Sequence, residues 1–331
     1  MSITKPAWAF TMDRRLLHAL AKGGVLIYLV VLVVGFGLAN DQFFSVNTLL
    51  TVIGASSPLM VAAAGMTMCL ICAEVDLSVV GVAGLASTLT ALLLFKGVPW
   101  PATVLAAIAV GACVGAINGV LTGHLVPVMP FFPSFFPTLA TTALTLGLAE
   151  ALLPSKQAIA ISDPAFATIF GFTTPLAVPI LYALAAVALV HLMLTRTALG
   201  YSIQCVGANR RAAPYVGVNV RWTKFWVLTI SGLLSGFAGV LVAGFFQAGY
   251  SLLAKGYDLD ALGAAVIGGT ALYGGKGSVL ASVSGVLVLA VLNTGLQLIQ
   301  VEPSVQLAAK GILVVLVVAV NLYLQRRLAL A

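Results

Sequence analysis

The chain has 331 residues, of which 61% are apolar and 8% are charged, and its formal net charge is +7. A soluble domain carries roughly 25% charged residues, so this composition excludes a soluble globular enzyme. The 33 glycines and 14 prolines follow no period, and 4 cysteines are too few for a disulfide scaffold, which excludes the collagen-like and disulfide-rich classes. The composition therefore predicts a membrane protein.

Long uncharged runs divide the chain, and a membrane-spanning helix needs about 20 apolar residues. Backbone groups in lipid must bond within their own segment, so continuous apolar runs favour helices over barrel strands. We predict an all-α polytopic membrane protein with about ten transmembrane helices. The expected spans lie near residues 20–39, 48–72, 78–95, 102–122, 136–153, 176–194, 224–246, 260–274, 279–299 and 306–324. The eighth is short and glycine-rich, so we expect it to be broken or tilted.

The basic residues are distributed unevenly between the two sides that these spans define. Of the 16 Lys and Arg residues, only Lys96, Lys156, Lys255 and Lys310 fall in the predicted outer segments. Cytoplasmic segments carry the excess of Lys and Arg, so both termini are predicted to be cytoplasmic. The positive charge then reflects topology and not nucleic-acid binding. We expect a cytoplasmic segment 1–22, one transmembrane domain 23–325 that begins with an uncleaved span, and a cytoplasmic tail 326–331.

The longest inner loop, residues 196–223, carries four arginines and no acid. Within it, Gly207 and Gly217 flank the stretch NRRAAPYV, which starts at Asn209, a residue type that caps helix N-termini. Pro214 limits any helix there to a short one. Charge alone leaves two alternatives open: contact with lipid headgroups, or docking of a cytoplasmic partner.

Two pairs of acids lie beside apolar runs: Glu74 with Asp76, and Asp258 with Asp260. Acids in or near a span are candidate functional residues. The alternative for the first pair is that Asp76 or Ser78 caps the next helix while Glu74 is solvated. The first pair is predicted inward and the second outward, which indicates two halves of inverted orientation.

Small and polar residues recur inside the predicted spans. Glycine at every fourth position lets helices approach closely, so Gly111, Gly115, Gly119 and Gly123 are predicted to pack against another helix, as are Gly232 and Gly236. Polar residues in spans either line a solute pathway or form hydrogen bonds between helices. The candidates are Asn118, Thr138, Thr142, Asn293 and Gln297.

We find no motif for catalysis or metal binding. Cys69 and Cys72 are more consistent with packing than with a metal site, because four ligands do not gather around them. The segment GGTALYGGKGS fails as a phosphate loop, because Lys276 is followed by Gly277 and not by Ser or Thr. The chain therefore needs no cofactor of its own, and any ATP would be hydrolysed by another subunit.

Several segments together resemble one family. They are GMT at 65–67 with VDLSV at 75–79, GANRRAAPYVGVNV at 207–220, SGLLSGFAGV at 231–240, and GYDLDALGAAVIGGTALYGGKGSVLASVSGVLVL at 256–289. Over about residues 40–325, the chain resembles the membrane permease subunit of sugar-type ATP-binding-cassette importers, the ribose, xylose and galactose branch. It differs at Ala73 and Glu74, where the family usually has glycine. It also differs at 126–147, which is richer in Pro and Phe and places Phe135 near a pathway helix.

The resemblance implies a bacterial inner-membrane subunit that moves a sugar or sugar-like small solute into the cytoplasm. Its partners would be a cytoplasmic ATPase that binds the ATP, a periplasmic solute-binding protein, and a second permease subunit in a homo- or heterodimer. The resemblance makes Gly207–Gly217 the coupling segment on the ATPase, including Asn209, Arg210, Arg211 and Ala212, with the arginines facing acidic groups. Asp76, Asp258 and Asp260 lie in the family's motifs.

Two other classes of function remain alternatives. An ion-coupled secondary transporter would use Glu74, Asp76, Asp258 or Asp260 as proton or sodium sites, and the lone chain would then drive uptake from an ion gradient. An intramembrane enzyme would need a cluster of reactive groups, and the sequence shows none.

Overall fold

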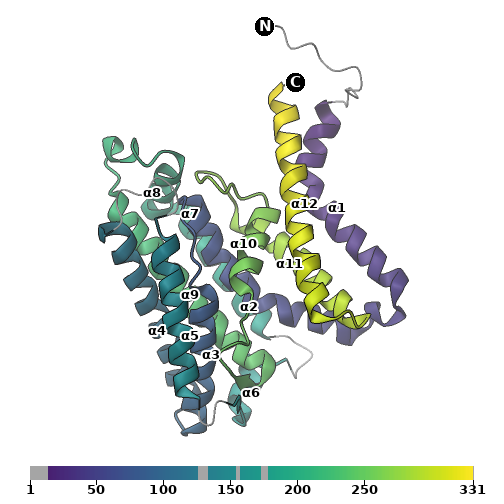
Figure 1. Ribbon diagram of the computed structural model, residues 1–331, viewed down its shortest axis with the longest axis vertical. Coiled ribbons are helices and arrows are strands. Elements are labelled where there is room, and N and C mark those ends of the chain that lie inside the picture. Colours follow the sequence, from purple (N-terminus) through teal and green to yellow (C-terminus); the bar gives the residue numbers. More distant parts are fainter. Residues whose placement is uncertain (1–13, 126–132, 154–156, 173–177, 331) are drawn as a thin grey trace.

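The structure is a computed structural model that describes residues 14–125, 133–153, 157–172 and 178–330. Most of this part of the chain is helical (Figure 1). The elements are α1 (Arg14–Ala39), η1 (Asp41–Phe44), α2 (Val46–Ile71), α3 (Val79–Phe95), α4 (Trp100–Val120), η2 (Leu121–Leu125), α5 (Phe135–Leu152), β1 (Ile159–Ala160), α6 (Pro164–Phe170), α7 (Val178–Arg196), α8 (Ala198–Ala208), η4 (Ala213–Val216), α9 (Val220–Phe246), β2 (Ala248–Gly249), α10 (Tyr257–Ile267), α11 (Val279–Leu298) and α12 (Pro303–Leu330). Residues 1–13 of the predicted N-terminal segment, and Lys156, lie outside the described residues.

Seven helices of the described chain are long and apolar enough to cross a membrane: α2, α4 with η2, α5, α7, α9, α11 and the Pro303–Val320 part of α12. Two shorter apolar helices, Gly24–Ala39 and α3, coincide with the predicted first and third spans. The all-α polytopic membrane fold is thus confirmed. The eighth expected span is the 11-residue α10. At 1.5 Å per residue it is about 16 Å long, roughly half of the hydrocarbon core, so the count of ten stays a prediction.

The central helix is α9, which packs against α4, α2 and α3. Where α4 crosses α9, Gly111 and Gly115 face Gly232 and Gly236. A Cβ atom on Gly111 would overlap the carbonyl oxygen of Gly232, and one on Gly232 would overlap that of Gly111. The predicted close packing of these glycines is therefore confirmed, and it brings two backbones into direct contact.

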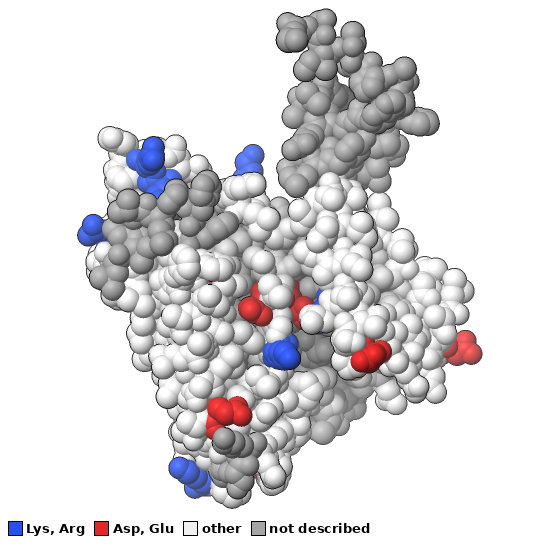
Figure 2. Space-filling model, in the orientation of Figure 1, with Lys and Arg blue, Asp and Glu red and all other residues white. Residues whose placement is uncertain are grey.

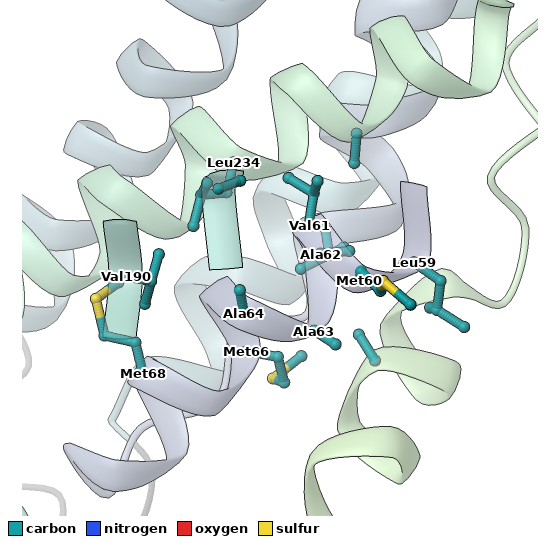
Figure 3. Close-up of a cluster of buried hydrophobic side chains, with 14 of the residues drawn as sticks. Leu59, Met60, Val61, Ala62, Ala63, Ala64, Met66, Met68, Val190 and Leu234 are labelled. Carbon is teal, nitrogen blue, oxygen red and sulfur yellow. The ribbon is translucent and has the colours of Figure 1, made fainter. Parts of the chain in front are cut away.

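The core is formed around the second half of α2. Residues 56–72 are all buried, which leaves this helix without a polar face and places it inside the bundle. Figure 3 shows its side chains with Val190 of α7 and Leu234 of α9. The α2 helix therefore contacts several neighbours at once, among them α9, α11 and α7.

Segments that the sequence assigns to one side of the membrane lie together in space. At one end, β1 pairs with β2, with Ile159 opposite Gly249. At the other end, α8 lies on the same side as the start of α1 and the end of α12, which stand beside the bundle (Figure 1). This grouping agrees with the predicted division of the loops into two sides.

Candidate functional site

The coupling segment, residues 207–217, is a compact turn between α8 and α9. Thr197 caps α8, accepting from Gly200 N at 3.2 Å. At the end of α8, Asn209 Oδ1 accepts from Arg211 N and Ala212 N at 3.0 and 3.1 Å. The predicted capping role of Asn209 is confirmed, although the element that it caps is a turn leading into the short 3₁₀ helix η4.

The outer surface of the coupling segment is basic and open. Gly217 has a φ of 80°, in the left-handed region that glycine favours, and it ends the turn. Tyr215 is 92% exposed and Val216 is 61% exposed, and Arg211 is also exposed. Figure 2 shows basic side chains at the upper left, over the region of α8, above a largely uncharged bundle. This surface suits a partner that offers acidic groups.

The inner side of the coupling segment rests on the end of α2. A Cβ atom on Gly207 would overlap the carbonyl oxygen of Ile71. The same oxygen accepts from Gly275 N at 2.8 Å. A side chain at residue 207 would push α8 away from α2, so close contact requires glycine there. The coupling segment thus sits directly on the chain that leads from α2 to α3.

That connection, residues 72–78, is named here the α2–α3 junction, and Glu74 is buried in it. The Glu74 carboxylate forms an ion pair with Lys224 Nζ of α9, and both side chains are at most 2% exposed. Glu74 Oε2 also accepts from Ser134 N, just before α5, at 3.1 Å. Ser134 Oγ in turn donates to Val75 O at 2.7 Å. One acid therefore joins the junction to α9 and α5.

Asp76 forms a second buried set of bonds in the same junction. Its Oδ1 accepts from Ser78 N at 2.9 Å and from Ser78 Oγ at 2.5 Å, and its Oδ2 accepts from Ser231 Oγ of α9 at 2.6 Å. Ser78 Oγ accepts from Asn118 Nδ2 of α4 at 3.0 Å. The carboxylate is satisfied by hydrogen bonds, and it links the start of α3 to α9 and, through Ser78, to α4.

Three predicted pathway residues belong to this region. Asn118 Oδ1 accepts from Thr141 Oγ1 at 2.8 Å, and Thr142 Oγ1 donates to Leu77 O at 2.8 Å. Thr138 Oγ1 donates within its own helix, to Ser134 O at 2.8 Å. Bonding between helices, the alternative left open by the sequence, therefore describes Asn118, while Thr142 bonds α5 to the α2–α3 junction. Phe135 is 41% exposed on α5.

The remaining predicted residues lie elsewhere. Asn293 and Gln297 are on α11, away from the α3–α5 group, and Gln297 lines an open cavity of about 820 Å³. Asp258 and Asp260 are in the first turn of α10, where Lys310 Nζ of α12 donates to Asp260 Oδ2 at 2.7 Å. The structure therefore does not bring all the predicted residues into one site.

The pairing of Glu74 with Lys224 was missed by the sequence reasoning. A solvated Glu74, one of the two alternatives for this acid, is wrong, because the residue is 1% exposed. The sequence did contain a signal for this pairing: Glu74 is an acid beside an apolar stretch, and a buried charge needs a partner of opposite charge. Lys224, at the edge of a predicted span, was a cation that could supply it.

Comparisons with known proteins agree with this architecture. A family model described as branched-chain amino acid transport system / permease component matches residues 48–318. The chain belongs to this permease family. The probable ABC transporter permease protein YphD of Escherichia coli is 35% identical over 92% of the chain and 90% of its own length. The ribose import permease RbsC of Haemophilus influenzae is 30% identical over 90% of the chain and 92% of its own length. The galactose/methyl galactoside import permease MglC of Escherichia coli is 31% identical over 91% of the chain and 94% of its own length. No solved structure is significantly similar to the chain.

Ala73 of the permease has a φ of 58°, a conformation that an L-residue adopts at a cost. We expect Ala73→Gly to stabilise the folded permease by about 0.5–1 kcal/mol, because glycine enters this region without strain. The measurement is the melting temperature in detergent. Ala109→Gly, at an exposed site inside α4, is the control and is expected to lower it. If both variants lowered it equally, the strain at Ala73 would be refuted.

Asp76→Asn replaces one carboxylate oxygen of the permease with an amide NH2 group. That group is a donor, and it would face the hydroxyl group of Ser231 or Ser78, which donates to Asp76 in the unmodified permease. The bonds to the charged carboxylate are worth about 1.5–3 kcal/mol each, so we expect roughly a tenfold loss of transport. Because the side chain keeps its shape, we expect membrane yield to fall much less. Uptake and the amount of folded permease are measured on the same preparation. Equal loss of both would show that Asp76 is purely structural.

Proposed function

We propose that the permease moves a sugar or sugar-like small solute into the cytoplasm, as the membrane subunit of an ATP-driven importer. The observation that carries this proposal is the near full-length similarity to permeases named for ribose and galactose import. The family description names branched-chain amino acids, but these relatives match at least 90% of the chain and are named for sugars. A sugar is therefore the favoured solute class.

The energy for transport comes, on this proposal, from a separate cytoplasmic ATPase. The exposed, acid-free surface of the coupling segment supports this, because its arginines suit an acidic cleft on such a partner. The 268–278 loop lacks the Lys-Ser/Thr pair of a phosphate loop, so ATP binds to the partner and not to this chain. A periplasmic binding protein delivers the solute on the opposite side.

For the membrane topology, we propose ten crossings with both termini in the bacterial cytoplasm and an inverted relation between the two halves. The excess of basic residues on the α8 side supports this orientation. Acids at the α2–α3 junction and in the first turn of α10 are consistent with the inverted relation. A second permease subunit completes the importer, as the homo- or heterodimer that the resemblance implies.

A part of the solute pathway is proposed along α11. The cavity that Gln297 lines is surrounded mostly by hydrogen-bonding side chains, which suit the hydroxyl groups of a sugar. Asn293 Oδ1, one turn away, is buried with no hydrogen-bond partner among the described residues. The lining comprises Asp41, Gln42, Phe44, Ser45, Asn47, Thr48, Thr51, Thr294, Gln297 and Leu298.

The test of the solute class is uptake into cells that produce the permease together with its ATPase and binding protein. Labelled ribose, allose, galactose and leucine are compared, each with and without the permease. We expect permease-dependent uptake of at least one sugar and none of leucine. Uptake of leucine alone would refute the proposed class.

A further inference from the structure

We propose that the buried ion pair between Glu74 and Lys224 is a positioning pair that makes the coupling segment and the α2–α3 junction move as one unit during transport. This inference rests on the proposed function and adds to it a pair of residues that carry motion from the ATPase side into the spans. Neither residue is proposed to touch the solute.

Lys224 lies close to the coupling segment in the chain. It lies five residues after Asn219, which caps α9 by accepting from Trp222 N at 3.1 Å. Asn219 itself follows the end of the coupling segment at Gly217 by two residues. Because a capped helix is a stiff element, displacement of the coupling segment moves Lys224 with it.

The coupling segment is tied to the junction at both of its ends. At its start, Gly207 rests against Ile71, the last residue of α2. Beyond its end, Lys224 holds Glu74, three residues after Ile71. The segment and the junction thus form a closed ring, in which the ion pair is the side-chain link and the glycine contact is the backbone link.

Glu74 also contacts the residue that precedes α5. Its second carboxylate oxygen accepts from Ser134 N, and Ser134 Oγ both donates to Val75 O and accepts from Val75 N, at 2.7 and 3.0 Å. These bonds attach the start of α5 to the junction. Movement that reaches Glu74 is therefore passed to α5, and through the neighbouring Asp76 bonds to the start of α3.

The energetics of the buried ion pair also indicate a role beyond folding. A buried ion pair is often no more stabilising than well-packed neutral residues, because both charges lose their water. The acid that contacts Lys224 Nζ is Glu74, so Glu74 is what compensates the buried ammonium charge. Folding alone gives little reason to keep such a pair here. A mechanical link between α9 and the junction does give a reason, because separating the two residues would leave a buried charge without its partner.

The experiment compares Glu74→Gln/Lys224→Met, which removes both charges together, with Glu74→Lys/Lys224→Glu, which exchanges them. Each importer is assembled with its ATPase and binding protein in proteoliposomes, and the ratio of sugar taken up to ATP hydrolysed is measured. The matched control is Lys255→Met/Glu302→Gln, which removes one base and one acid, both exposed, and breaks no ion pair found in the structure.

We expect the neutral pair to reach near-normal membrane yield but to lower the transport ratio at least about fivefold, a typical lower bound for coupling between sites. The exchanged pair restores the link between α9 and the junction but cannot accept the hydrogen bond from Ser134 N. Its transport ratio should therefore recover only in part, to at least about twice that of the neutral pair, and the control should keep the normal ratio. A normal ratio in the neutral pair, or no recovery in the exchanged pair, would overturn the proposal.

Failure of both variants to accumulate in the membrane would assign the pair to folding and overturn the proposal as well. Absence of ATP-driven uptake in the unmodified importer is a separate result, because it would refute the proposed function and this inference with it.

Discussion

Replacing Gly232 with leucine is expected to lower the yield of folded permease at least about tenfold, because it separates the two most intimately packed helices. A Cβ atom at this position would overlap Gly111 O and lie 2.7 Å from Gly115 Cα. These are backbone atoms, which can yield only if α4 moves as a whole. Overpacking usually costs about 1–3 kcal/mol, and a shift of a whole helix raises that cost.

The measurement is the monodisperse fraction of the permease after solubilisation, followed by size-exclusion chromatography. The matched control is Gly147→Leu, because Gly147 is a helical glycine of α5 with nothing within 4 Å of its Cβ position. The control should keep its yield. Comparable losses from both substitutions would show that the α4–α9 crossing does not depend on glycine.

Replacing Arg210 and Arg211 with glutamate is expected to reduce ATP-driven uptake at least about tenfold while leaving the permease folded. The double change turns the basic surface of the coupling segment acidic, so it would repel the acidic groups proposed on the ATPase. Reversal of charge at an interface commonly costs several kcal/mol. Arg211 is exposed, whereas Arg210 is only partly exposed and makes an interaction within the protein. Arg211→Glu alone is therefore measured beside the double variant, because it changes only the exposed charge.

Uptake, ATPase co-purification and melting temperature are measured together on this variant. Lys96→Glu/Lys255→Glu is the matched control, since it reverses two exposed charges that lie outside the coupling segment. We expect the control to keep ATPase binding. Undiminished ATP-driven uptake by the arginine variant would refute the coupling role of this surface.

The helices were predictable from the sequence because charged residues mark their ends. The span expected near 48–72 is Val46–Ile71, and the one expected near 279–299 is Val279–Leu298. The run 260–274 was misjudged in length, because hydropathy does not detect where a helix stops. There α10 ends at Ile267, and Gly269, with a φ of 88°, turns the chain away.

Only those features of the candidate site that depend on residues close together in the sequence were predictable. The cap at Asn209 and the glycines of the α4–α9 crossing follow from residue type and spacing over a few positions. The pairing of Glu74 with Lys224 joins residues 150 positions apart, and so depends on how α9 packs against α2 and α3. The contact of Gly207 with Ile71 is of the same kind, since residue type alone does not show which backbone lies opposite.

The most direct test of the account is uptake of labelled sugar into proteoliposomes that contain the purified permease. With a proton or sodium gradient alone, we expect no uptake above the leak of empty vesicles. After the ATPase, the binding protein and ATP are added, we expect uptake that stops when ATP is withdrawn. Uptake by the lone permease from an ion gradient would contradict the account and identify a secondary transporter.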